Sequence, residues 1–331
     1  MTEQHTLNAD DIRIFSGNSN PELAADIAKW LGVSLQPTTI KRFTNDNLYV
    51  QLGASVRSRS VFIIQSLTPP VNDHLMELLM MLDIARSASA KQVHAVIPYF
   101  SFARSDKKDA PRISITARLV ADLLQTAGAT HVMTMVLHSP QVHGFFSVPA
   151  DPLTSRGVFQ QYFRQQDLGG AVVVAPDIGS AKSAARFARD LGGLPVAAGN
   201  KERVSDTQVV INGIIGNQLH GCKRAIIYDD EIATGGSMLE LTRILLREGI
   251  PDIQLVCTHG LFTNNALDRL GALPEIKAIV TTDTIYHPVA TRHPKLVVVP
   301  VGHVFGDAIR RNYLGESIGD LFVFGSADGD K

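Results

Sequence analysis

The stretch Ala225-Ile226-Ile227-Tyr228 is a short apolar run, and the polar loop Asp229-Asp230-Glu231-Ile232-Ala233-Thr234-Gly235-Gly236-Ser237 follows it. An apolar run that ends in acidic residues is typical of a buried parallel strand, whose carboxyl end binds ligands in α/β folds. The two glycines and the hydroxyl residues precede a predicted helix, where backbone N–H groups suit a phosphate. Adjacent aspartates suit the vicinal hydroxyls of a sugar, directly or through Mg²⁺. We therefore expect a sugar phosphate to bind this loop; the alternative is a surface turn with an N-capped helix and two solvated acids.

The same succession of strand, turn and helix extends along the whole chain. Short β-branched runs predict strands at residues 60–65, 94–98, 131–136, 171–175, 224–228, 253–258, 278–281 and 295–301. Apolar residues at three- and four-residue spacing predict helices at residues 22–31, 73–87, 114–126, 180–191, 237–248 and 304–313. Apolar strands that alternate with helices indicate an α/β fold with mainly parallel sheets covered on both faces.

This succession runs twice, which predicts two domains, and a length of 331 residues fits two cores. We expect an N-terminal domain at residues 11–152, a C-terminal domain at 153–312, and a tail at 313–331 that packs back on the first domain. The polar segment 200–218 lacks helical period and is expected to form a long loop or a β-excursion.

The composition narrows the classes of partner. The formal net charge of −1 gives no general attraction to nucleic acid or to anionic membranes. No apolar run approaches the ~18 residues of a membrane span, and the polar start has no signal-peptide core. The two cysteines, Cys222 and Cys257, form neither a disulfide framework nor a metal-ligand spacing. We expect a cytoplasmic protein without nucleic-acid or membrane partners.

Several separate motifs, in the same order along the chain, resemble the ribose-phosphate diphosphokinase (PRPP synthetase) family. The loop 229–237 resembles the ribose 5-phosphate loop of type I phosphoribosyltransferases, and the other matching stretches are residues 98–108, 137–146, 175–179, 201–203 and 257–260. The resemblance extends from Ile14 to Phe324. It implies two tandem phosphoribosyltransferase-like (type I) domains. It also implies transfer of the β,γ-diphosphoryl group of ATP to the 1-hydroxyl of ribose 5-phosphate, with release of AMP. Such a reaction brings four phosphates together, so cations and Mg²⁺ must neutralise their charge.

The resemblance also implies a role for individual residues. The catalytic cations that close over the reacting phosphates are Lys201 and Arg203. The nucleotide-binding residues are Phe43, Asn45, Asn47, Arg104, Ser105 and His138. The residues for ribose 5-phosphate are Asp177, Asp229, Asp230, Ala233, Thr234, Gly235, Gly236 and Ser237. The expected Mg²⁺ ligands are His138 and Asp177. Members of the family typically form homohexamers in which the nucleotide site borrows residues from a neighbouring subunit, so we expect a homo-oligomer.

The chain departs from the family pattern at four places. Val136 replaces the usual Asp of an Asp-Leu-His motif, and Ala233 replaces the usual Asp of the ribose loop. Amides stand at Asn45 and Asn47 where the family has acids, and Ser105 replaces a Gln. An amide donates hydrogen bonds as well as accepting them, so base preference could change. Fewer carboxylates should weaken Mg²⁺ binding or change the number of ions.

Three functions follow as hypotheses. The first is an active diphosphokinase acting on ribose 5-phosphate and ATP, or on an altered donor or sugar phosphate. The second is a catalytically weak or silent paralogue that regulates an active synthetase; Val136 and Ala233 favour it, whereas Lys201 and Arg203 argue against it. The third is a phosphoribosyltransferase that consumes PRPP, which would not need the N-terminal motifs.

Overall fold

The computed structural model describes residues 7–203, 209–215, 219–288 and 293–322, with the backbone alone at 201–203 and 209–212. Its contacts divide the chain into two compact units. Unit 1 contains the chain up to Thr154, together with Thr284–Tyr286 and the chain from Val301 onward. Unit 2 contains Ser155–Asp283 and His287–Pro300.

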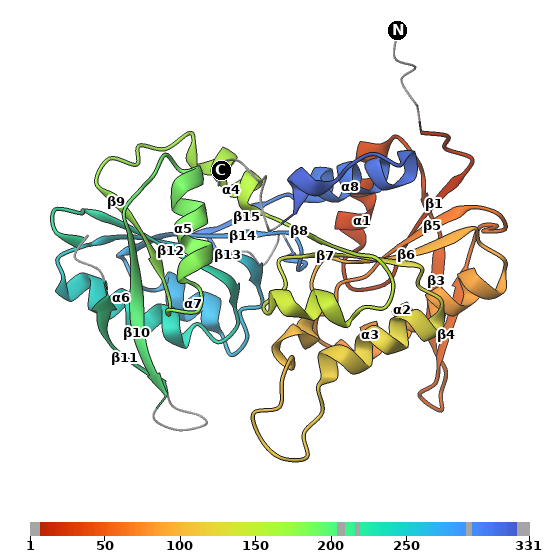
Figure 1. Ribbon diagram of the computed structural model, residues 1–331, viewed down its shortest axis with the longest axis horizontal. Helices are drawn as coiled ribbons and strands as arrows, with labels where there is room; N and C mark the ends of the chain where they lie inside the picture. The colour runs from red at the N-terminus through yellow and green to blue at the C-terminus, as the bar shows by residue number, and fades with distance from the viewer. Residues whose placement is uncertain (1–6, 204–208, 216–218, 289–292, 323–331) are drawn as a thin grey trace, which may run out of the picture. The chain divides into compact units, whose positions relative to one another are not determined.

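In the described residues of unit 1, a six-stranded parallel sheet has the order β2-β1-β5-β6-β7-β8. The strands are β1 (Ile12–Ser16), β2 (Leu35–Gln36), β5 (Ser60–Ile64), β6 (Gln92–Ile97), β7 (His131–Met135) and β8 (Ala150–Leu153). The helices are α1 (Pro21–Leu31), α2 (Val71–Ser87), α3 (Thr116–Ala127) and α8 (Gly302–Leu314), with the 3-10 turns η1 (Ser101–Arg104), η2 (Pro140–Phe145) and η5 (Gly319–Leu321). The strands β3 (Thr38–Arg42) and β4 (Leu48–Leu52) form a separate antiparallel hairpin. Figure 1 shows α1 and α8 on one face of the sheet, and α2 and α3 on the other.

The central strands of unit 1 are apolar because both faces of the sheet are covered. Every residue of β5 is buried, and so are all residues of β6 except Gln92. Local signals fix the ends of α1. The side chain of Asn20 accepts the N–H of Leu23 at 3.2 Å, and Gly32 ends the helix with a φ of +69°. The apolar pattern therefore accounts for the central strands, and the capping residues account for the ends of α1.

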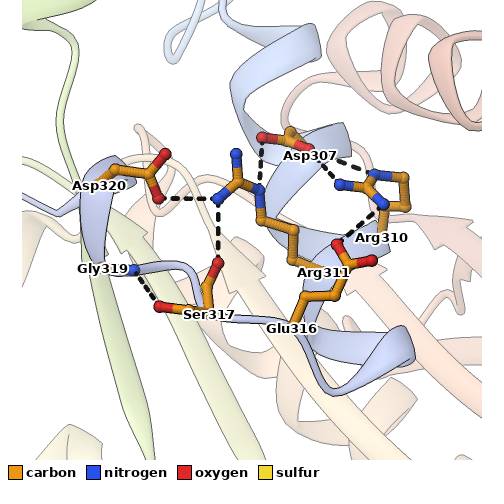
Figure 2. A network of polar contacts seen from close by, with 7 residues as sticks. All are labelled: Asp307, Arg310, Arg311, Glu316, Ser317, Gly319 and Asp320. Atoms are coloured by element: carbon orange, nitrogen blue, oxygen red, sulfur yellow. Dashed lines mark hydrogen bonds and ion pairs between the residues drawn. The ribbon is translucent and has the colours of Figure 1, made fainter. Parts of the chain in front are cut away.

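The chain after α8 is held on unit 1 by charged contacts (Figure 2). The guanidinium of Arg311 donates to Asp307 at 2.8 Å, to the Ser317 carbonyl at 3.0 Å and to Asp320 at 2.7 Å. Further on, the Leu321 carbonyl accepts the N–H of Thr154 at 2.8 Å, and Phe322 forms an antiparallel bridge with Leu153. The segment 315–320 is thus held by α8, and residues 321–322 lie beside the end of the edge strand β8.

In the described residues of unit 2, a seven-stranded sheet has the order β11-β10-β9-β12-β13-β14-β15. Its strands are β9 (Ala171–Ala175), β10 (Val196–Arg203), β11 (Val209–Ile215), β12 (Arg224–Ile232), β13 (Asp252–Gly260), β14 (Ile276–Thr282) and β15 (Leu296–Val299). Only the β10–β11 pair is antiparallel among these described pairs. The helices are α4 (Arg156–Phe163), α5 (Ala181–Asp190), α6 (Gly236–Arg247) and α7 (Ala266–Gly271).

Alternate residues of β9 face two separate cores. Val172 and Val174 pack with the apolar side of α6, whereas Val173 and Ala175 pack with α4 and α5. Figure 1 shows α5 on one face of this sheet and α6 with α7 on the other. No helix among the described residues is long and apolar enough to cross a membrane.

The structure confirms the α/β class and every strand and helix that the sequence predicted, with ends shifted by a few residues. The prediction missed β1, β2, β8, the β3–β4 hairpin, α4, α7 and the part of β10 before residue 200. It also ended β12 at Tyr228, whereas the strand continues to Ile232 because β13 pairs with it to that point. The two units divide between Thr154 and Ser155, and α8 belongs to unit 1. The domain boundaries drawn from the sequence remain a prediction.

Candidate active site

The sheet of unit 2 has a topological switch point between β9 and β12. From β9 the chain passes through α5 to β10 on one side, and from β12 it passes through α6 to β13 on the other. Pairing of β9 with β12 ends at Val174 and Ile227, whereas β12 stays paired with β13 as far as Ile232. The end of β12 therefore lies at the switch point beyond its pairing with β9, and ligands of α/β sheets bind at such points.

Acidic side chains meet at this switch point. Asp177 follows β9, and Asp229 and Asp230 lie in the last part of β12. Burial of the Asp229 carboxyl, together with repulsion from Asp230 and from Asp177, raises its pKa well above the usual value. An added cation would relieve this repulsion.

The donor set fits Mg²⁺, which prefers oxygen ligands and often keeps substrate phosphates and waters with one or two protein carboxylates. No group of three or more His, Cys, Asp or Glu among the described residues forms a metal cage by itself. Asp177, Asp229 and Asp230 supply carboxylate oxygens of the kind that Mg²⁺ takes together with substrate phosphates.

Asp177 also shapes the turn into α5. Its Oδ1 accepts the backbone N–H of Ser180 at 3.0 Å and the hydroxyl of Ser180 at 3.2 Å. Ser180 is the N-cap residue of α5, but its side chain makes no capping hydrogen bond to the helix. The same hydroxyl lies 3.1 Å from the Asp177 carbonyl oxygen, so Asp177 and Ser180 stabilise the turn before α5 together.

The loop 233–237 opens α6 and presents its first turn. Gly235 has a φ of +70°, and a Cβ there would lie 3.0 Å from the Leu270 side chain, so this position requires glycine. The first N–H groups of an α-helix have no acceptor within the helix, and Gly235, as N-cap, has no side chain to supply one. Thr234 and Gly236 are exposed to solvent. The loop is therefore a solvent-accessible anion cradle at the N-terminus of α6, which is a helix of 12 residues.

A buried acid beside the loop escaped the sequence prediction. Glu231 is 7% exposed and lies in register with His259, which is 2% exposed. The sequence did mark His259, because residues 257–260 match a motif of the family. That His259 lies opposite Glu231 depends on the register of β12 and β13 and could not be predicted.

The nucleotide-side residues Arg104, Ser105 and His138 all lie in unit 1, just beyond the adjacent strands β6 and β7. Arg104 ends η1, and His138 precedes η2; both side chains are exposed. The carboxylate of Asp106 accepts hydrogen bonds from the Ser139 hydroxyl and, at 3.1 Å, from the Gln141 amide. The two predicted loops are thus joined by side chains.

The remaining nucleotide residues lie at the tip of the β3–β4 hairpin. The ring of Phe43 is 51% exposed and makes an edge contact with Tyr49 at 5.9 Å between centroids. The side-chain oxygen of Asn45 accepts the N–H of Asn47 at 3.3 Å. One of the two amides therefore holds the turn, and Phe43 presents an aromatic face to solvent.

Lys201 and Arg203 lie on the last part of β10, where Lys201 is opposite Ile211 and Arg203 is opposite Val209 of β11. The described part of the polar segment 200–218 is thus a β-excursion; residues 204–208 and 216–218 lie outside the described residues. The side chains of the two cations are also outside the description, so their convergence on phosphates stays a prediction.

Comparison with known proteins assigns the family. Residues 12–128 match the N-terminal domain of ribose phosphate pyrophosphokinase, and residues 209–323 match the phosphoribosyl synthetase-associated domain. A putative ribose-phosphate pyrophosphokinase of Streptomyces coelicolor is 50% identical over 312 residues, which cover 94% of this chain and 98% of the relative. The chain belongs to the ribose-phosphate pyrophosphokinase family. The ribose-phosphate pyrophosphokinase of Deinococcus radiodurans is 46% identical over 316 residues, covering 94% of this chain and 97% of the relative.

A solved relative of this pyrophosphokinase family confirms the fold. The crystal structure of phosphoribosylpyrophosphate synthetase from Mycobacterium smegmatis matches with a TM-score of 0.85 and 33% identity, over 92% of this chain and 99% of that chain. The resemblance drawn from the motifs, and the expected phosphoribosyltransferase-like α/β architecture, are thereby confirmed. The comparisons give no support to the regulatory subunit or to an altered specificity.

Proposed function

We propose that this chain is a ribose-phosphate diphosphokinase that transfers the β,γ-diphosphoryl group of ATP to the 1-hydroxyl of ribose 5-phosphate, giving PRPP and AMP. The observation that carries the proposal is the switch point of unit 2, where three aspartates lie next to an open anion cradle at the start of α6. Family membership over both units supports it.

On the ribose side, the chain's own groups suit each part of the sugar phosphate. The backbone N–H groups of residues 234–237 bind the 5-phosphate at the helix N-terminus. The carboxylates of Asp229 and Asp230 accept hydrogen bonds from vicinal ribose hydroxyls, which orients the 1-hydroxyl toward the donor. Asp177 supplies an oxygen ligand for Mg²⁺, which when bound neutralises phosphate charge.

On the nucleotide side, cations and aromatic groups suit ATP. Arg104 contacts the triphosphate and Phe43 stacks on the base, while Asn45, Asn47 and Ser105 complete base and phosphate recognition. His138 is assigned to the metal–triphosphate group. Lys201 and Arg203 stabilise the charge that develops on the phosphates during transfer. A cytoplasmic homohexamer is part of the same proposal.

The direct test measures nucleoside monophosphate release. The pure protein is incubated with Mg²⁺, ribose 5-phosphate and one nucleoside triphosphate at a time. We expect AMP and PRPP in equal amounts with ATP. Absence of product with every donor, together with co-purification of an active homologue, would overturn the proposal in favour of a regulatory subunit.

A second test concerns the proposed catalytic lysine. Lys201→Ala should lower kcat by roughly a hundredfold or more, because it removes a positive charge beside the reacting phosphates. Steady-state kinetics and thermal melting check this, with Lys277→Ala as control, since the Lys277 amine only caps the Pro274 carbonyl at 2.9 Å. An unchanged kcat would remove Lys201 from the catalytic residues.

A further inference from the structure

A side chain outside the predicted site joins its two nucleotide-side loops. Asp106 lies two residues after Arg104, and its Oδ2 accepts both the Ser139 hydroxyl and the Gln141 side-chain N–H. Ser139 is the residue directly after His138 and is only 9% exposed. One carboxylate oxygen therefore links the loop after β6 to the loop after β7.

The loops on either side of this link are themselves supported by fixed elements. The N–H of Ser105 donates to the Phe102 carbonyl at 2.9 Å, and the Ser105 carbonyl accepts the N–H of Ala117 in α3 at 3.2 Å. On the other side, the N–H of Val142 donates to the Ser139 carbonyl at 3.0 Å. Ser105, next to Asp106, and Ser139, its hydrogen-bond donor, are thus both held in their turns, so the Asp106 carboxylate bridges two supported turns.

An apolar contact runs parallel to the polar one. Phe100 and Phe146 meet edge to face with ring centroids 5.9 Å apart, which also joins the two loops. A ring contact of this kind tolerates sliding, whereas a carboxylate with two donors fixes direction and distance. The polar link is therefore the part that determines where Arg104 and His138 lie relative to each other.

We infer that Asp106 is a positioning residue for the nucleotide: it holds the Arg104 turn and the His138 turn at the separation that the triphosphate spans. This inference rests on the proposed function. Asp106 acts through Ser139 and Gln141, because its Oδ2 is engaged by their donors, and it does not itself hold ATP. Removing its carboxylate leaves both turns folded but free to shift, and a shift of about 1 Å at a reacting group costs up to roughly a hundredfold in rate.

The test is a double-mutant cycle with kinetics for both substrates. Asp106→Ala should raise KM for ATP by about tenfold and leave KM for ribose 5-phosphate within about twofold, because that substrate binds in unit 2. Ser139→Ala should shift KM for ATP in the same direction. The double variant should be no worse than Asp106→Ala alone, since both changes remove one interaction. Asp83→Ala, an exposed acid of α2 in the same unit, is the charge-matched control and should leave both KM values unchanged.

Three results would overturn the inference. If the fold-increases in KM for ATP of Asp106→Ala and Ser139→Ala multiply in the double variant, the carboxylate acts without this link. An unchanged KM for ATP in Asp106→Ala would show that the link positions nothing, and an equal rise in both KM values would show a general loss of structure. If Asp106→Ala does not fold, Ser139→Ala and Gln141→Ala carry the test. If the wild-type protein forms no AMP, the proposed function fails, and equilibrium binding of Mg·ATP to wild type and variants decides the inference separately.

Discussion

Val136 has a backbone φ of +42°, in the left-handed region that β-branched residues rarely adopt. Its N–H donates to the Leu153 carbonyl of β8 at 3.0 Å, which fixes this conformation. The position lies two residues before His138 and is the one where the family resemblance leads us to expect Asp. Asp and Asn tolerate this region because their short polar side chains bond locally. The backbone at position 136 thus has a conformation that suits Asp or Asn, although the residue is valine.

Relief of this strain gives the first prediction. Val136→Asn should stabilise unit 1 by about 1 kcal/mol, since a non-glycine residue in a sparsely populated region costs roughly 1–3 kcal/mol. Denaturant unfolding measures the gain. The control is Val33→Asn, at a similarly half-buried valine that lacks a positive φ. A loss of stability in Val136→Asn, equal to that of the control, would show that the valine is unstrained.

At the scale of elements, the two sheets repeat one arrangement. The order β2-β1-β5-β6-β7-β8 of unit 1 corresponds to β10-β9-β12-β13-β14-β15 of unit 2, so unit 1 has a switch point between β1 and β5. There the Gln65 oxygen accepts the N–H and hydroxyl of Ser19, and its amide donates to Glu77 at 2.8 Å. A Cβ at Gly17 would lie 2.3 Å from that oxygen. In unit 1, hydrogen-bonded side chains of Ser19, Gln65 and Glu77 fill the switch point. In unit 2, aspartates border it instead.

The buried imidazole of β6 gives a prediction on acid stability. His94 is 2% exposed and stacks on Phe62 at 4.1 Å; burial and, second, the neighbouring His131 lower its pKa to about 4. Between the usual value of 6.5 and about 4, the unfolded chain binds this proton and the folded chain does not. Stability should therefore fall as the pH drops through this window, by about 3 kcal/mol in total from this group.

Unfolding free energies between pH 7 and pH 4 measure the effect. His94→Gln removes the titrating group, so its loss of stability over this window should be smaller than that of the wild type by about that amount. Parallel curves for wild type and His94→Gln would contradict the prediction.

The elements that sequence predicted are those with a long apolar period or a fully buried run, such as α2 and β5. The missed strand β8 has four residues and contains Pro152, so neither period nor propensity marks it. The location of Asp177 and Asp229 at strand ends was predictable, because motif order gives it, whereas their role stays a prediction. The link from Asp106 to Ser139 was not, since it joins loops 33 residues apart that have no shared pattern. The φ of Val136 likewise depends on its pairing with β8.

At the scale of the whole molecule, the chain leaves unit 1 after β8 and builds unit 2, except for Thr284–Tyr286, which belong to unit 1; it returns to unit 1 as α8. Close packing completes unit 1: a Cβ at Gly306 of α8 would lie 2.5 Å from the Trp30 ring of α1. The last turn of α8 then holds the tail through Arg311 (Figure 2). Unit 1 therefore needs both ends of the chain, and removal of residues after 301 would expose the face of α1.

The proposed homohexamer makes a prediction about where one nucleotide site is built. Phe43 lies on an exposed hairpin tip, which is where a residue that completes the site of a neighbouring subunit is expected to lie. If each site combines Phe43 of one chain with Arg104 of another, Phe43→Ala and Arg104→Ala chains are both nearly inactive alone. Mixed at equal amounts and reassembled, they should recover about a quarter of wild-type activity, because random neighbours restore a complete site in that fraction of cases. AMP release after reassembly measures this. A site built within one chain gives no recovery, and that outcome would place Phe43 and Arg104 in the same subunit's site.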